Sequence, residues 1–232
     1  MARWPDSLAL VFDVDGVIVD SNVLHTETWD QYVRRYGRTL PEGFGRNIFG
    51  RHNRDIVRDL FGPGLTPEEI DRHGAAKEAL YRERMKPLLK EHLVPGVVEF
   101  IERHAGWPLA VASNAEAANV NLVLEHSGLR RFFRAALDAS QVSRPKPDPE
   151  IYLRAAELLG VTPADCVIFE DSFSGVAAAH AAGARIVGLQ TTHLDLPGAD
   201  LLIRDFLAPE LDAWLEAQRS GPGTGYTGKR DS

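Results

Sequence analysis

Two aspartates near the start of the chain have the type and spacing needed for phosphoryl transfer. Asp13 and Asp15 fall at and just after the end of a nearly continuous apolar run over residues 8–14, and Gly16 follows them. A carboxylate can attack phosphorus directly, and a second carboxylate can protonate the leaving oxygen and then deprotonate water. A glycine lets the backbone turn closely around an anion. The pattern favours Asp13 as a nucleophile and Asp15 as its acid and base.

Three further polar groups end later apolar runs or lie in the loops after them. These are Ser113 with Asn114, Lys146, and Glu170 with Asp171. In open α/β sheets, ligands bind beyond the carboxyl ends of the strands, so we expect all the groups to converge in one crevice. A serine hydroxyl can donate to a phosphoryl oxygen, and a lysine adds a fixed positive charge. Taken singly, each group also fits an ordinary turn or helix cap, so the argument depends on the whole set.

The acidic residues of this set predict a divalent metal ion. Carboxylates held close together repel one another unless a cation lies between them. Mg²⁺ prefers hard oxygen ligands, and it would offset the repulsion between an attacking carboxylate and an anionic phosphoryl group. From the residues alone, Asp13, Glu170 and Asp171 suit such a site.

Apolar runs and helical patterns alternate over most of the chain. We expect strands at residues 8–14, 109–112, 166–169, 184–189 and 201–203, and helices at residues 115–127, 148–160 and 174–182. Asp148 is expected to be the N-cap of its helix, with Pro149 in the first turn. Continuous apolar runs are typical of strands buried on both faces of a parallel sheet, and their alternation with helices predicts a doubly wound α/β fold.

Residues 22–92 interrupt this alternation and contain no convincing strand. Helical patterns cover residues 23–36, 53–61 and 67–84, and a capping box from Thr66 to Glu69 begins the third. We therefore predict a core of residues 1–21 and 93–219 with an all-helical cap of residues 22–92. Residues 220–232, rich in glycine, serine and threonine, are predicted to be a disordered tail.

Composition limits the remaining possibilities. The chain has 232 residues, of which 44% are hydrophobic and 25% charged, and its net charge of -7 argues against a nucleic-acid partner. Cys166 is the only cysteine and is expected to be a buried, inert thiol. No apolar stretch reaches the roughly 20 residues of a membrane span, and residues 1–6 do not resemble a signal peptide. We expect a cytoplasmic monomer that acts on a small phosphorylated metabolite.

The four groups resemble, in order and spacing, the motifs of the haloacid dehalogenase superfamily, in the subgroup with a helical cap after the first strand. The matching stretches are residues 12–21, 112–114, 146–149 and 169–175, and the likeness extends over about residues 8–207. It implies that Asp13 is both nucleophile and metal ligand. It also implies that Asp15 is the acid and base and offers its backbone carbonyl to the metal.

The same resemblance assigns the remaining groups of the core. Ser113, with Asn114, and Lys146 would hold the phosphoryl group, while Glu170 and Asp171 would complete the Mg²⁺ site directly or through water. True dehalogenases lack an aspartate equivalent to Asp15, and phosphonatases replace it and carry a Schiff-base lysine in the cap. The aspartate at this position therefore favours phosphate-ester chemistry.

The expected cap holds the candidates for substrate recognition. His25 and Trp29 are four residues apart on one helix face, and their spacing is similar to that in beta-phosphoglucomutases, as is the position of Lys77. Gly50, beside Arg51, matches the glycine of that group's cap loop. His25, Trp29, Arg51 and Lys77 each also fit an ordinary core or surface position.

The same loop separates two possible activities. Beta-phosphoglucomutases carry a lysine and an arginine where this chain has Phe49 and Asn53, although Arg51 or Arg54 could take their place. A mutase must hold the second phosphate of a bisphosphate, so the sequence favours a phosphatase of a sugar phosphate, with a mutase as the alternative. Hexose phosphates, phosphoglycolate, sugar-acid phosphates and nucleotides all remain open. A non-enzymatic phospho-acceptor module or a regulatory protein that keeps the fold is the remaining alternative.

Overall fold

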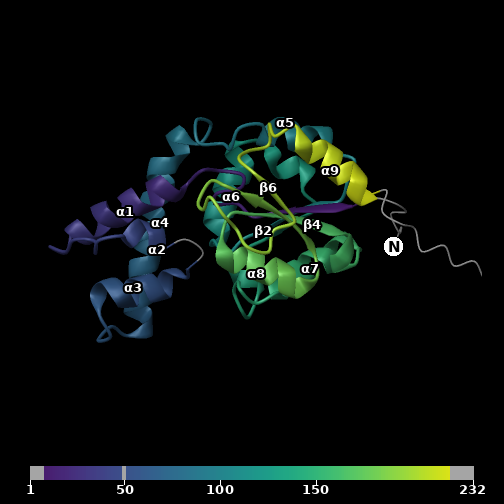
Figure 1. Cartoon of the computed structure of the whole chain (residues 1–232). Coiled ribbons are helices and arrows are strands. Elements are labelled where there is room, and N and C mark those ends of the chain that lie inside the picture. Colours follow the sequence, from purple (N-terminus) through teal and green to yellow (C-terminus); the bar gives the residue numbers. More distant parts are fainter. Residues whose placement is uncertain (1–7, 49–50, 220–232) are drawn as a thin grey trace, which may run out of the picture.

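The computed structural model describes residues 8–48 and 51–219, and a six-stranded parallel sheet forms its centre (Figure 1). The strand order is β3-β2-β1-β4-β5-β6, with every neighbouring pair parallel. The strands are β1 (Ala9–Phe12), β2 (Leu109–Ala112), β3 (Ala135–Leu137), β4 (Cys166–Glu170), β5 (Arg185–Leu189) and β6 (Leu201–Ile203). Because the strands are parallel, their carboxyl ends share one edge of the sheet.

Helices cover both faces of this sheet, as the continuous apolar strands predicted (Figure 1). One face packs against α5 (Val97–Arg103), α6 (Ala117–His126) and α9 (Glu210–Arg219), and its core includes the stacked rings of Phe12 and Phe169. The other face packs against α7 (Glu150–Leu159) and α8 (Phe173–Ala182). The predicted doubly wound α/β fold is confirmed.

Four helices lie between β1 and α5, and we call them the helical insert. They are α1 (Asn22–Arg34), α2 (Phe44–Asn47), α3 (Asn53–Phe61) and α4 (Pro67–Leu88). The insert has a hydrophobic cluster of its own, in which Trp29, Val57 and Leu80 are buried. The predicted capping box at the start of α4 is present: Thr66 Oγ1 accepts from the Glu69 N–H at 3.3 Å. The division into two domains stays a prediction.

The two segments that join the insert to the sheet run side by side. The Asp20 N–H donates to the His92 carbonyl at 2.7 Å, and the Val94 N–H donates to the Ile18 carbonyl at 3.0 Å. These hydrogen bonds place the start of α1 and the end of α4 next to each other, beside the carboxyl edge of the sheet.

Several boundaries differ from the sequence prediction. α4 continues to Leu88 and contains Pro87, and α7 begins at Glu150, after Pro149. Pro149 is therefore the N-cap position, while Asp148 still accepts the Glu150 N–H at 3.0 Å. The strand β3 and the helices α2, α5 and α9 were not predicted. Three 3-10 turns complete the described chain: Leu129–Phe132, Ala139–Gln141 and Pro163–Asp165.

Two predictions, on a signal peptide in residues 1–6 and on a disordered tail at residues 220–232, concern segments that lie outside the described residues. Within residues 8–48 and 51–219, no helix has the length and apolar character needed to cross a membrane.

Candidate active site

Asp13 lies directly after β1 at the carboxyl edge of the sheet, and it is buried. Its Oδ2 atom is 3.3 Å from Nζ of Lys146. The same ammonium group donates to Glu170 Oε1 at 2.6 Å and to the Ala112 carbonyl at 2.9 Å. Burial raises the pKa of Asp13 to about 7, although the charge of Lys146 opposes this change. One lysine thus balances two buried carboxylates from different strands.

Asp13, Glu170 and Asp171 form a compact acidic cluster. Each offers a carboxylate oxygen, and these three atoms lie within 4.8 Å of one another. Burial raises the pKa of Asp171 well above its usual value, and the nearby charges of Glu170 and Asp13 add to the effect. The cluster therefore resists full ionisation unless a cation enters it. An all-oxygen donor set of this kind suits a hard divalent ion such as Mg²⁺.

Two glycines let the backbone approach this cluster closely. Gly16 has a positive φ of 72°, and a Cβ atom there would lie 1.8 Å from Asp171 Oδ2. A Cβ atom on Gly175, in α8, would lie 1.9 Å from the carboxyl carbon of Glu170. A side chain at either position would displace the carboxylate of Asp171 or Glu170, so glycine at both positions keeps the acidic cluster compact.

Glu170 is held by hydrogen bonds from both sides. Tyr152 on α7 donates its hydroxyl proton to Oε1, and the Asp171 N–H donates to Oε2 at 3.2 Å. Ser172 Oγ also donates to Oε2 at 3.1 Å, and the same serine oxygen caps α8 by accepting the Gly175 N–H at 3.0 Å. Ser172 therefore both caps α8 and orients the Glu170 carboxylate.

Asp15 lies at the side of the site that faces the helical insert. Its Oδ1 atom accepts from Ser21 Oγ at 2.6 Å and is 3.4 Å from Nε2 of His25. Burial alone would raise the pKa of Asp15, but the hydrogen bonds from His25 and from the Ser21 hydroxyl outweigh it and lower the pKa. Asp15 is thus connected to the insert through α1, which carries His25.

Ser113 and Asn114 follow β2 and border the same site. The Ser113 N–H donates to the Leu137 carbonyl at 3.1 Å, and its Oγ accepts the Ala115 N–H at 3.2 Å. Asn114 contacts the Lys146 backbone: its Oδ1 accepts the Lys146 N–H at 3.1 Å. Asn114 is thus hydrogen-bonded to the loop that carries Lys146, and its predicted contact with the phosphoryl group stays a prediction. All the core groups predicted from the sequence meet at one edge of the sheet.

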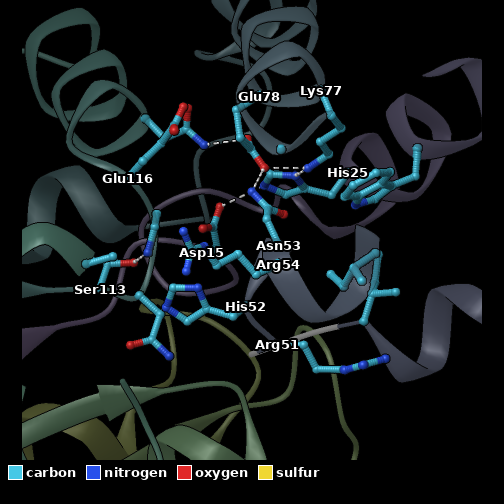
Figure 2. Close-up of a pocket in the computed structure, with 18 of the residues that line it drawn as sticks. Asp15, His25, Arg51, His52, Asn53, Arg54, Lys77, Glu78, Ser113 and Glu116 are labelled. Carbon is cyan, nitrogen blue, oxygen red and sulfur yellow. Dashed lines mark hydrogen bonds and ion pairs between the residues drawn. The ribbon is translucent and has the colours of Figure 1, made fainter. Parts of the chain in front are cut away.

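A cavity of about 370 Å³ opens between this edge and the helical insert (Figure 2). Its floor includes Asp13, Asp15 and Ser113, and residues of α1, α3 and α4 form the opposite wall. This volume is within the range of sites for small metabolites.

The structure places four of the five predicted cap residues on the wall of the cavity. Lys77 is 1% exposed, and its Nζ atom is 2.7 Å from Nδ1 of His25. Trp29 is also buried, with Lys77 Nζ 5.1 Å from its ring, so it serves the packing of the insert as well as the cavity. Arg51 is paired with Asp59 at 2.7 Å. Gly50 lies outside the described residues.

Sequence reasoning missed the polar residues that support these groups. Tyr152 contacts Glu170, while Asn22 and Thr192 contact Asp171. Glu78 and Asn119 line the cavity and hydrogen-bond to each other. Their positions depend on how distant elements pack, and the only available sequence signal was that Glu78 directly follows Lys77.

The arrangement is that of an α/β protein with a buried acidic cluster and a lysine at the carboxyl ends of its parallel strands. A family model for haloacid dehalogenase-like hydrolases matches residues 8–183. The chain belongs to this family, and the prediction of a hydrolase of the haloacid dehalogenase superfamily is confirmed.

Curated relatives include two sugar phosphatases. Fructose-1-phosphate phosphatase YqaB from Escherichia coli is 32% identical over 176 residues, which covers 75% of this chain and 92% of the relative. A phosphorylated carbohydrates phosphatase from Thermotoga maritima is 34% identical, covering 78% and 84% of the two chains.

Solved structures show the same fold. Beta-phosphoglucomutase from Clostridium difficile matches with a TM-score of 0.80 over 92% of this chain and 97% of the other, at 22% identity. CbbY from Rhodobacter sphaeroides, solved in complex with phosphate, matches with a TM-score of 0.72 over 87% and 96%, at 28% identity.

Proposed function

We propose that this protein is a Mg²⁺-dependent phosphatase that hydrolyses a sugar monophosphate through an aspartyl phosphate on Asp13. The observation that carries the proposal is the cluster of Asp13, Glu170, Asp171 and Lys146, in which Asp13 and Asp171 line the cavity. The names of the two sugar phosphatases among the relatives support the choice of substrate class.

In the first step, a carboxylate oxygen of Asp13 attacks phosphorus while the bond from phosphorus to the sugar oxygen breaks. Asp15 gives its proton to that leaving oxygen. The pKa of Asp15 is lowered in the free protein, so this step requires the negative charge of the bound phosphoryl group to favour its protonated form. Lys146 and Ser113 hold the phosphoryl oxygens.

In the second step, water attacks the phosphorus of the aspartyl phosphate, and Asp15 accepts the proton that the water loses. The bond between phosphorus and the Asp13 oxygen breaks, which releases inorganic phosphate and restores the free carboxylate. Mg²⁺, bound by Asp13, Glu170, Asp171 and the backbone carbonyl of Asp15, would neutralise negative charge on the phosphoryl group in both steps.

The charges of the cavity wall favour a phosphatase over a mutase. Each lysine or arginine among the described residues that line the cavity has a carboxylate partner: Lys77 with Glu78, Arg51 with Asp59, and Arg54 with Asp71. Asn53, where mutases carry an arginine, donates to Glu78 at 2.7 Å. A second phosphate on the substrate would have to compete with these carboxylates.

The test is a panel of sugar monophosphates incubated with the protein and Mg²⁺. Release of inorganic phosphate, abolished by a chelator, is the expected result. Formation of an isomeric sugar phosphate without net phosphate release would assign a mutase instead, and phosphorus NMR distinguishes the two products. No turnover of any phosphate ester would refute the proposed activity.

A further inference from the structure

Glu78 is a buried acidic residue in the cavity that has no part in the mechanism above. It lies on α4 of the helical insert, and it is 3% exposed. Figure 2 shows Glu78 beside Lys77, His25 and Asn53 on one side of the cavity, across from Ser113. A carboxylate at this depth requires several donors to replace its water.

The Glu78 carboxylate is surrounded by donors from three elements. Oε1 accepts from Lys77 Nζ at 2.7 Å and from Asn53 Nδ2 at 2.7 Å. Oε2 accepts from Asn119 Nδ2 at 2.7 Å. Asn119 belongs to α6, which packs on the sheet, so Glu78 joins the insert directly to the core. A neighbouring contact, from Arg82 to Asn119 Oδ1 at 2.8 Å, fixes the orientation of the asparagine amide.

Lys77 extends this network towards the reacting groups. A charged lysine can donate hydrogen bonds but cannot accept them. The contact of 2.7 Å between Lys77 Nζ and His25 Nδ1 therefore makes Nδ1 the acceptor. The ring proton of neutral His25 must then lie on Nε2, the atom 3.4 Å from Asp15 Oδ1. Stacking on Tyr81, with ring centroids 3.8 Å apart, holds the imidazole in this plane. A continuous path thus runs from Asn119 through Glu78, Lys77 and His25 to Asp15.

We propose that Glu78 is a positioning residue: its hydrogen bond with Asn119 holds the insert against the core, and its contact with Lys77 places the Nζ atom that orients His25 towards Asp15. The inference rests on the proposed function, because Asp15 must be the acid that protonates the leaving sugar oxygen. Its consequence is that Asp15 is correctly oriented only when α4 lies against α6.

The substitution Glu78→Gln tests this role because glutamine has nearly the same shape. The glutamine amide nitrogen must face one of the three donors, Lys77, Asn53 or Asn119, and Lys77 loses the negative charge beside it. The kcat/KM for a sugar phosphate, whose alkoxide leaving group needs a proton, should fall by about tenfold or more. The kcat/KM for an aryl phosphate, whose phenolate leaves without protonation, should change by less than about twofold. Loss of packing alone would lower both values together.

A second variant tests the geometry. In Glu78→Gln combined with Asn119→Asp, the glutamine amide can donate to the new carboxylate while the total charge stays the same. The ratio of kcat/KM for the sugar phosphate to kcat/KM for the aryl phosphate should return towards the wild-type ratio. Glu27→Gln is the control, since it disrupts an exposed contact between Glu27 and Arg84 that also joins α1 to α4. It should leave both substrates unaffected.

The outcomes separate this inference from the proposed function. If the wild type hydrolyses no phosphate ester, the proposed function fails. If the wild type is active and Glu78→Gln affects both leaving groups equally, or neither, the positioning role is wrong. Nitrogen-15 NMR of His25 gives a readout independent of activity: the wild type should show the proton on Nε2, and Glu78→Gln a mixture of the two tautomers. An unchanged tautomer in Glu78→Gln would also overturn the inference.

Discussion

At the scale of single residues, buried charges in this protein are balanced in two separate clusters. In the core, Lys146 contacts Asp13 and Glu170. In the insert, Lys77 contacts Glu78, and each of these two side chains is almost fully buried. Removing one partner of such a pair leaves the other charge without compensation in a poorly hydrated place, which is the costly change. Both clusters border the same cavity.

Glu78 gives a prediction for the dependence of stability on pH. Burial alone would raise the pKa of Glu78, but the charge of Lys77 and the hydrogen bonds from Lys77 and Asn119 lower it from 4.5 to about 2. A lowered pKa stabilises the fold above the unfolded value of 4.5, and this contribution is lost as the pH falls from 4.5 towards 2. It amounts to about 3 kcal/mol.

Unfolding of the wild type and Glu78→Gln by urea, measured across this pH range, checks the prediction. The difference in unfolding free energy between the two proteins should shrink as the solution becomes more acidic. A difference that stays constant with pH would show that Glu78 is not held in its ionised form by its neighbours.

At the scale of elements, the sequence predicted those strands and helices that leave a continuous apolar run or lie beside an ordered motif. β1, β2 and β4 were predicted because each is a buried run that ends in a polar group of the site. β3 and β6 are both edge strands of three residues, but β3 is Ala-Ala-Leu, whose small side chains give a weaker strand pattern than the Leu-Leu-Ile of β6. α5 was missed because its seven residues give only a short helical pattern. The contact of α4 with α6 arises only from packing, so the Glu78–Asn119 pair had no sequence signature.

The approach of α8 to β4 gives a second prediction. Gly175→Ala would place a methyl group on the Glu170 carboxylate, so either the helix or the carboxylate must move. We expect a loss of about 2 kcal/mol of stability, typical of overpacking, together with weaker binding of Mg²⁺.

Gly106→Ala is the matched control, because a Cβ atom there meets nothing within 4 Å. It should change stability by less than about 0.5 kcal/mol. Urea unfolding and Mg²⁺ titration of the two variants test the pair. Normal metal binding by Gly175→Ala would show that the close approach of α8 is not needed to position Glu170.

At the scale of the whole molecule, the insert and the core meet at the carboxyl edge of the sheet (Figure 1), and the lining residues place the cavity between them. In the proposed reaction, closing of the insert onto the core would exclude water, and opening would release the product. Such a motion would change the hydrogen bonds between α4 and α6 and those between the two linkers.

Metal binding should be visible in the stability of the whole protein. The carboxylates of the acidic cluster repel one another without a cation, so Mg²⁺ should bind the folded chain far better than the unfolded one. At about one hundred times its Kd, the ion should add about 2.7 kcal/mol and raise Tm by about 5 °C or more. Differential scanning fluorimetry with and without a chelator measures the shift. Asp171→Asn should largely remove it, and an equal shift in that variant would place the metal elsewhere.

The most direct test of the account is to trap the covalent phosphoenzyme. After a single turnover with a sugar phosphate, rapid acid quenching and peptide mass spectrometry should find one phosphoryl group on the peptide that contains Asp13. Asp15→Asn should accumulate more of this species, because breakdown needs the base, and Asp13→Asn should form none and have no turnover. Full turnover by Asp13→Asn, or a phosphoryl group on a different residue, would contradict the assignment of Asp13 as the nucleophile.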